Sequence, residues 1–139
     1  MTIATKRIQI NTKGHTDTIN VTTDISREVN NSGINSGTVT VFIPGSTAGI
    51  TAIEYEPGLI SDIKDMWERL VPSTINYEHN KAWGDENGHS HARSSLLGPS
   101  ITIPFVNKRL TLGTWQQVVV VDFDNRPRSR EIILQIMGE

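Results

Sequence analysis

Several features are absent from this chain of 139 residues, and each absence excludes a class of protein. It contains no cysteine, so disulfides, thiolate metal sites and cysteine nucleophiles are excluded. No apolar run approaches the roughly 20 residues that span a bilayer, and the first residues lack the apolar core of a signal peptide. The net charge of −2 provides no basic stripe for nucleic acid. We therefore expect no membrane and no nucleic-acid partner, and a cytoplasmic location.

What is present describes an ordinary folded domain. Hydrophobic residues make up 36% of the chain and charged residues 20%, which is typical of globular rather than disordered proteins. The sequence contains no internal repeat, low-complexity tract or linker. A single compact domain over residues 1–139 is therefore expected.

Alternating apolar residues predict that strands dominate the fold. The pairs Ile8/Ile10 and Ile19/Val21 flank a turn at residues 13–15 and suggest an amino-terminal hairpin. Further strands are predicted at 39–43, 49–55, 100–105, 110–112, 116–124 and 132–137, with a turn at 107–108. Four consecutive valines, 118–121, indicate a strand that is covered on both faces.

Two helices are predicted between these strands. Leu59, Ile60, Ile63, Met66, Trp67 and Leu70 form an apolar stripe at helical spacing, between Pro57 and Pro72. This pattern indicates a helix over about 57–71. A shorter helix over about 24–32 would be capped by Asp24, and its Ile25 and Val29 would lie on one face. The fold class is then α+β, with a mostly antiparallel sheet.

The segment from Trp83 to Gly98 holds the densest set of reactive side chains. If it is extended, the imidazoles of His89 and His91 point the same way, and His79 lies ten residues earlier. Imidazole clusters bind Zn²⁺ and similar ions, with Asp85, Glu86 and Asn87 as further ligands or orienting partners. An inert polar loop whose histidines bond to the backbone is the equal alternative.

Other polar groups lie at strand ends. The turns at 44–49 and 112–116 offer N–H groups and hydroxyls to a phosphate, or are simply structural, and Trp115 either stacks on a flat ring or is buried. Glu54 and Glu56 share a strand face that suits acid–base work, although Glu56 also suits a helix start. Asp122 and Asp124, close to Arg126, Arg128 and Arg130, are interpreted mainly as a solvated strand end with ion pairs.

Taken together, ordered blocks of the chain resemble the YjbQ family, often labelled secondary thiamine-phosphate synthase. The blocks are Pro44–Ile50 with Glu54, Tyr77–His79, Asn87–His91, Ser95–Ser100 and Leu112–Gln116. Their order and spacing match across roughly residues 39 to 138. One departure is that many members carry histidine where this chain has Gly45, and aspartate where it has His89.

The resemblance implies an α+β homotrimer with sites near subunit contacts. It also implies that a pyrimidine diphosphate is joined to a thiazole phosphate, with release of pyrophosphate. On this basis His79, His91 and His89 are expected to hold a divalent metal, Zn or Mg, and no organic cofactor is indicated. Glu54, Asp85 and His91 are the expected catalytic groups. The expected phosphate-binding and substrate-binding residues are Arg93, Ser95, Gly113, Thr114, Trp115 and Gln116.

Two alternatives use the same residues. One is a non-catalytic trimeric protein that binds a phosphorylated metabolite or a metal, since no residue is an obvious nucleophile and no motif identifies a reaction class. The other is metal-dependent hydrolysis of a small phosphorylated compound. Turnover separates the first alternative from synthesis, and phosphate release without coupling identifies the second.

Overall fold

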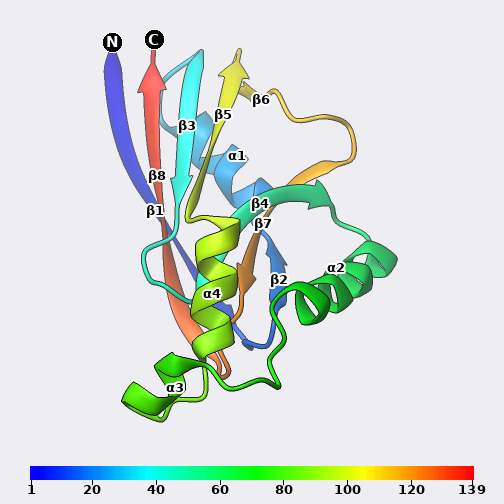
Figure 1. The fold of residues 1–139 in the computed structure, drawn as a ribbon. Coiled ribbons are helices and arrows are strands. Elements are labelled where there is room, and N and C mark those ends of the chain that lie inside the picture. Colours follow the sequence, from blue (N-terminus) through cyan, green and yellow to red (C-terminus); the bar gives the residue numbers. More distant parts are fainter.

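The computed structural model describes residues 1–139 as two antiparallel sheets and four helices (Figure 1). The strands are β1 (Thr2–Thr12), β2 (Asp17–Asn20), β3 (Gly37–Phe42), β4 (Ala48–Glu54), β5 (Ser100–Val106), β6 (Arg109–Leu110), β7 (Gln116–Asp122) and β8 (Arg128–Gly138). The helices are α1 (Thr22–Asn31), α2 (Pro57–Leu70), α3 (Glu78–Trp83) and α4 (Gly88–Leu97). The predicted α+β class is confirmed.

The larger sheet has the strand order β1-β8-β3-β5-β6, so the two ends of the chain lie side by side (Figure 1). β1 pairs with β8 from Thr2↔Gly138 to Thr12↔Arg128. The predicted hairpin between residues 8–10 and 19–21 is therefore wrong, because β2 pairs with β7 in the other sheet. At the connection, the N–H groups of His15 and Thr16 donate to the carbonyls of Asp124 and Asp122. These bonds tie the turn to the end of β7 instead of to a neighbouring strand.

The smaller sheet, β2-β7-β4, is covered on both faces, as the valine run predicts. Val118 and Val120 join the main core of 17 buried residues between the sheets. Val119 and Val121 face the other way and pack with Trp67 and Phe123 in a second, smaller cluster. Alternate side chains of a strand point to opposite faces, so this one strand serves both clusters.

The two predicted helices are present with small changes at their ends. Asp24 does not cap α1. Asn20 accepts the N–H of Thr22 instead, and Asp24 pairs with Arg27 one turn later. Ile25 and Val29 are buried as expected. In α2, Glu56 is the N-cap and accepts from the N–H groups of Gly58 and Leu59, which confirms the helix-start alternative for this residue.

Helix α4 lies against β4 and brings the polar segment onto the scaffold (Figure 1). Ser94 donates to the carbonyl of Ala48 at 2.6 Å. A Cβ on Gly49 would lie 2.8 Å from both the Gly98 carbonyl oxygen and the Leu97 side chain, so this close approach requires glycine. The amino terminus of α4 thereby faces the β3–β4 connection. None of the helices is both long and apolar enough to cross a membrane.

Candidate functional site

The part of the polar segment that holds His89 and His91 is helical and not extended, and this changes how the two histidines are arranged. His89 and His91 both lie in the first turn of α4. Successive residues of a helix are about 100° apart, so residues two apart point to nearly opposite sides. His89 is buried beside the ring of Tyr77, with centroids 6.4 Å apart, whereas His91 stacks on His79 of α3. His89 and His91 therefore do not point the same way and do not form a pair.

The close histidine pair is instead His79 with His91. Their ring centroids are 4.3 Å apart and their planes are inclined by 39°. Burial, and after it the neighbouring His79, lowers the pKa of His91 below 6.5. The Nδ1 atom of His79 is buried and has no hydrogen-bond partner. His91 is thus a neutral imidazole at neutral pH, the form that accepts a proton or binds a metal.

Two carboxylates at the end of β7, Asp122 and Asp124, are fully buried, contrary to the predicted solvated strand end. Asp122 accepts from Arg130 through both oxygens, with Nε at 2.8 Å and Nη2 at 3.0 Å, and from Thr12 Oγ1 at 2.7 Å. Bidentate pairing of this kind is geometrically specific and roughly twice as strong as neutral hydrogen bonding. The prediction of ion pairs is confirmed, while the prediction of solvation is wrong, because three chain segments converge over this strand end.

Asp124 is the second buried carboxylate. Arg128 Nε donates to its Oδ2 at 2.7 Å, and Asn87 Nδ2 donates to its Oδ1 at 3.3 Å. Burial raises the pKa of Asp124, but the hydrogen bonds from Arg128, Asn125 and Asn87 outweigh it and hold the pKa below 3.8. Thr47 Oγ1 links the two pairs, since it donates to Asp124 and accepts from Arg130. Charged groups at this end of the molecule are consequently held in fixed positions.

An open cavity of about 360 Å³ is lined in part by Thr47, Arg128 and Arg130 of this network. Helix α3, which also contributes to its lining, lies at the end of the molecule away from the chain termini (Figure 1). We call this cavity the histidine basin. It is lined by Gly45, Ser46, Thr47, His79, Trp83, Asp85, Asn87, His91, Arg128 and Arg130. Of the predicted site residues, His79, His91 and Asp85 are brought together here. The exposed Trp83 is the aromatic residue at its rim.

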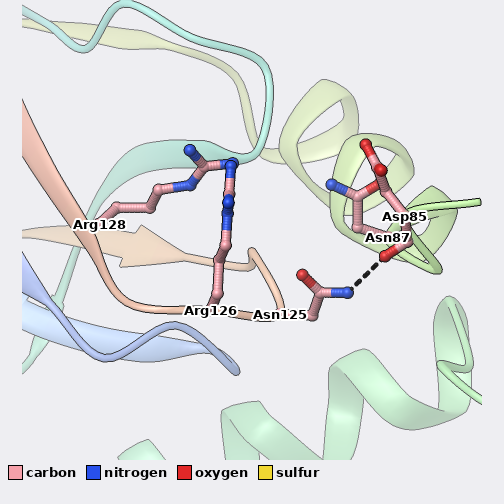
Figure 2. A pocket seen from close by; sticks show the side chains of 5 residues that line it. All are labelled: Asp85, Asn87, Asn125, Arg126 and Arg128. Carbon is pink, nitrogen blue, oxygen red and sulfur yellow. Dashed lines mark hydrogen bonds between the residues drawn. The ribbon is translucent and has the colours of Figure 1, made fainter. Parts of the chain in front are cut away.

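A smaller cavity of about 180 Å³ adjoins the basin and shares Asp85, Asn87 and Arg128 with it. We call it the arginine pocket, and Asn125 and Arg126 complete its lining. Figure 2 shows the two arginines on one side of the pocket and Asp85 and Asn87 on the other. Asn125 Nδ2 donates to the backbone carbonyl of Asp85 at 2.7 Å, which ties the two walls together (Figure 2).

Arg93, a predicted phosphate ligand, lies in neither cavity. Its side chain is buried, and it donates to Glu68 Oε1 at 2.8 Å, to the Val71 carbonyl at 3.0 Å and to Thr16 Oγ1 at 3.1 Å. The guanidinium therefore holds α2 and α4 together instead of facing a ligand. Ser95 is also away from the basin, on the exposed side of α4, and its hydroxyl donates to the Ala92 carbonyl.

Glu54 and residues Gly113–Gln116 are far from the basin within one chain. Glu54 pairs with Gln116 at one end of the β4/β7 ladder, and Ala48 pairs with Asp122 at the other. Six residue steps of a strand separate these ends by about 20 Å. Trp115 is exposed, and Gln116 Oε1 accepts the N–H of Gly113 in a local turn. The resemblance implies that Glu54 and Gly113–Gln116 act together with His91. Within a single chain the fold does not bring them to the histidines.

Gly45, the position where the resemblance implies a histidine in many family members, lines the same basin as His79 and His91. His89 is buried on another side of α4 and does not line the basin. It therefore does not replace an imidazole at position 45. A Cβ at Gly45 would meet Arg130 Nη1 at 3.0 Å, and the backbone φ of +110° is one that side chains rarely adopt.

The basin offers two imidazoles and no complete zinc site within the chain. No group of three or more histidine, aspartate or glutamate side chains is arranged to hold a metal ion. A structural or catalytic zinc site takes at least three protein ligands. The orphaned Nδ1 of His79 is a donor atom of the right type, but this donor set by itself does not fit zinc.

Sequence reasoning missed the part of the site that lies on β7 and β8. Asp122, Asp124, Arg128 and Arg130 were recognised as charged but not as buried, and Thr47 was noted only as part of a turn. One signal was available. Asp122-Phe123-Asp124 directly continues a strand of buried valines, so both aspartates continue the face that Val118 and Val120 occupy. Carboxylates in such positions need partners, and Arg128 and Arg130 follow at the same spacing.

Comparison with known proteins places this architecture in a family. The family model described as "UPF0047 protein YjbQ-like" matches residues 6–139. The chain belongs to the YjbQ family. A UPF0047 protein of Methanothermobacter thermautotrophicus is 37% identical over all of this chain and 95% of its own length. The UPF0047 protein YugU of Bacillus subtilis is 33% identical over 96% of this chain and 98% of its own length.

Solved structures of other proteins show the same fold. A "YbjQ-like protein of unknown function" from Sulfolobus solfataricus superposes with a TM-score of 0.94 at 30% identity, and 99% of each chain is covered. A hypothetical protein from Aeropyrum pernix reaches a TM-score of 0.90 at 31% identity, over 98% of this chain and 99% of its own. The two-sheet scaffold of this chain is thus the scaffold of these relatives.

Proposed function

We propose that the histidine basin binds a phosphorylated small molecule and displaces its phosphate-bearing group. The observation that carries the proposal is the meeting of the His79/His91 pair with Arg128 and Arg130 in one open cavity. Both guanidiniums are held in place by buried carboxylates, so they are oriented before a ligand arrives. Fixed cationic donors of this kind stabilise charge that develops on a leaving group.

The reaction that best matches the family resemblance is of the thiamine-phosphate synthase type. The nitrogen of a thiazole phosphate forms a bond to the methylene carbon of a pyrimidine diphosphate, and the carbon–oxygen bond to pyrophosphate breaks. The electron pair of that bond leaves with the pyrophosphate oxygen. In this scheme Arg128 and Arg130 face the departing anion, and the exposed ring of Trp83 offers a stacking surface for a flat heterocycle.

His91 has a defined protonation state in this proposal. His91 is neutral at neutral pH because its burial and His79 lower its pKa. It therefore accepts a hydrogen bond or binds a divalent ion and does not contribute a fixed positive charge. Asp85, on the same rim, is the carboxylate available to the basin. We derive no step through a zinc ion, because the chain supplies two imidazoles where such a site needs three protein ligands.

We further propose a homotrimer in which neighbouring subunits complete the site. About 20 Å separates the basin from the Glu54/Gln116 end of β4. The predicted catalytic and phosphate-binding groups therefore do not meet within one chain, which supports a site completed by a second subunit. The exposed Trp115 next to Gln116 is an aromatic residue of the kind that interfaces bury. Sedimentation equilibrium at several protein concentrations tests this, and a monomer at all of them overturns it.

The activity is tested with purified protein, a pyrimidine diphosphate, a thiazole phosphate and Mg²⁺. We expect thiamine phosphate and pyrophosphate in equal amounts, and at least a roughly hundredfold loss of rate in His91→Asn, which is the scale of one lost preorganised contact in an active site. The matched control is His15→Asn, because His15 is exposed and does not line the basin. Asparagine also tolerates the positive φ of this position.

Three results would decide against synthesis. Release of phosphate without coupling identifies a phosphohydrolase. Binding of either phosphorylated compound without turnover identifies a binding protein. Equal activity of His91→Asn and the unaltered protein removes the histidine basin from the reaction.

A further inference from the structure

A further cavity lies between α2 and the small sheet, and its character differs from that of the two polar cavities. Its volume is about 250 Å³, seven of its nine lining residues are hydrophobic, and none is charged. It shares no lining residue with the histidine basin or the arginine pocket. We call it the α2 cavity. Neither the family resemblance nor the comparisons assigns it a ligand, and its lining does not suit a phosphorylated one.

The walls of the α2 cavity come from elements that are distant in sequence. Val119 and Val121 of β7 are buried and form one wall, and the buried Trp67 of α2 lies beside them. Ile63 and Met66 of α2 are only half-buried, so the cavity opens to solvent along this helix. An unfilled apolar cavity leaves its lining atoms without packing partners. A small apolar molecule supplies these contacts.

Three of the lining side chains carry a hydrogen-bond donor, and two of these donors are unused. The hydroxyl of Thr18 already donates to the backbone carbonyl of Thr16 at 3.2 Å. The hydroxyl of Thr51 and the indole N–H of Trp67 have no hydrogen-bond partner within the chain. A donor in an apolar environment is stabilised when it meets an acceptor, and it costs free energy when it does not. The α2 cavity therefore favours a ligand that carries one acceptor atom.

Size and charge narrow the choice of ligand. An apolar protein cavity of about 150 Å³ holds a benzene molecule. By proportion, the α2 cavity admits roughly ten non-hydrogen atoms, which corresponds to an aromatic ring with a short substituent. Because no charged residue lines the cavity, a charged ligand would lose its hydration without gaining an ion pair. An aromatic ring suits the cavity better than a flexible alkyl chain, because it packs on the indole of Trp67 and loses little conformational freedom.

We propose that the α2 cavity binds a neutral aromatic molecule of this size that carries one hydrogen-bond acceptor, such as the carbonyl oxygen of an aryl ketone. The ring lies against Val119, Val121 and Trp67, and the acceptor faces the hydroxyl of Thr51 and the indole N–H of Trp67. This site goes beyond the proposed function, because its ligand is uncharged and its lining is separate from the histidine basin.

The three tryptophans of the chain make the test specific to this site. Trp67 lines the cavity, whereas Trp83 and Trp115 are exposed and lie outside it. The full chain, labelled with nitrogen-15, is titrated with acetophenone while the three indole N–H resonances are followed by NMR, after their assignment with Trp83→Phe and Trp115→Phe. We expect a saturable shift of the Trp67 resonance alone. Ethylbenzene, which lacks the carbonyl, should bind at least about threefold more weakly, the scale of one lost hydrogen bond.

Two variants separate filling of the cavity from loss of the donor. Ile63→Phe places a ring in the opening and should weaken the binding of both probes by at least about tenfold, because little of the volume remains free. The matched control is Leu70→Phe on the same helix, since Leu70 is exposed and does not line the cavity. Thr51→Val keeps the shape of the side chain and removes its hydroxyl. It should reduce the preference for acetophenone and leave the affinity for ethylbenzene unchanged, whereas damage to the fold would weaken both.

Other outcomes are equally decisive. The site is overturned if neither probe shifts the Trp67 resonance saturably, or if the Trp83 and Trp115 resonances shift as much, which would mean general adsorption. Equal affinity for the two probes overturns the role of the acceptor. If acetophenone binds as expected to a protein that forms no thiamine phosphate, the proposed function fails and the α2 cavity stands as a binding site.

Discussion

At the scale of single residues, Asp122 and Asp124 organise the charged end of the molecule. Both are fully buried, and each is satisfied by an arginine of β8 together with hydroxyl or amide groups from other segments. A buried ion pair costs desolvation free energy, so its value lies less in net stability than in fixing where the guanidiniums point. In this protein the guanidinium of Arg128 lines the arginine pocket and the histidine basin, and that of Arg130 lines the histidine basin.

Asp122→Ala should destabilise the fold by about 3–5 kcal/mol, because Arg130 would keep a largely buried charge without its partner. Urea denaturation at pH 7 measures this. The control is Glu131→Ala, which removes an exposed pair with Arg7 and should cost at most about 1 kcal/mol. Similar losses in the two variants would contradict the importance of the buried pair.

At the scale of elements, α2 is only thinly covered by the rest of the fold. Its apolar stripe is largely half-buried, and only Trp67 is fully inside, where its ring meets Phe123 edge-on at 4.9 Å. Arg93 of α4 adds a second attachment through Glu68 and the carbonyl of Val71. The position of α2 against the small sheet therefore depends on a few side chains.

Trp67→Ala should lower the free energy of unfolding by about 3–5 kcal/mol, because it empties the centre of the smaller cluster. Leu70→Ala on the same helix is the matched comparison. Leu70 is 60% exposed, so its loss should change stability by no more than about 0.5 kcal/mol. Thermal unfolding followed by circular dichroism distinguishes the two. A small effect of Trp67→Ala would mean that α2 is held elsewhere.

The Glu68–Arg93 pair should make stability depend on acid pH. The hydrogen bond from Arg93, and then that from Ser73, lowers the pKa of Glu68 from 4.5 to about 2 in the folded chain. Stabilisation from a depressed carboxyl pKa is complete above pH 4.5 and is lost as the pH falls toward 2. Because Glu68 is half-exposed, solvent screening limits this contribution to about 1 kcal/mol.

Glu68→Gln should flatten the corresponding part of the stability profile between pH 4.5 and 2, as measured by urea midpoints at each pH. Glu78→Gln is the comparison, since its pair with Lys81 is fully in solvent. If both variants keep the full acid dependence of the unaltered protein, the dependence belongs to other groups, with buried Asp124 the first to examine.

At the scale of the whole molecule, strands from the two ends of the chain hold the larger sheet together. β8 is central because it pairs with β1 on one side and β3 on the other. Arg128 and Arg130, which line the polar cavities, lie at the start of β8. This end of β8 is remote from the chain termini (Figure 1). The pairing of β8 with β1 and β3 therefore fixes the strand that carries Arg128 and Arg130.

Removal of residues 1–7 should expose the edge of β8 from Ile133 to Gly138 and cause self-association. We expect a lower unfolding midpoint and higher-mass species on size-exclusion chromatography. Deletion of Met1 alone is the control, since this residue lies outside the ladder. A truncated chain with the oligomeric state and midpoint of the control would show that β1 is dispensable.

Local patterns predicted the parts of this fold that depend on neighbours in sequence. The stripe of α2, the buried face of α1 and the doubly covered valine strand follow from spacing alone. The turn at Asn107–Lys108 was also predicted, and both residues adopt the positive φ of a tight hairpin turn. By contrast, Ile8 and Ile19 alternate as strands should, but alternation does not say which strand is the partner, and the predicted hairpin was wrong.

The candidate site depended more on tertiary structure than the fold did. The sequence by itself identified the polar segment and placed His79, His91 and Asp85 among its important residues. Only the folded chain paired His79 with His91, turned His89 away and committed Arg93 to a structural role. The physical reason is that a side chain's direction depends on local backbone geometry. Its burial and its charge partners depend on which segments the fold brings together, and some of these are distant in sequence, such as Thr12 and Asp122.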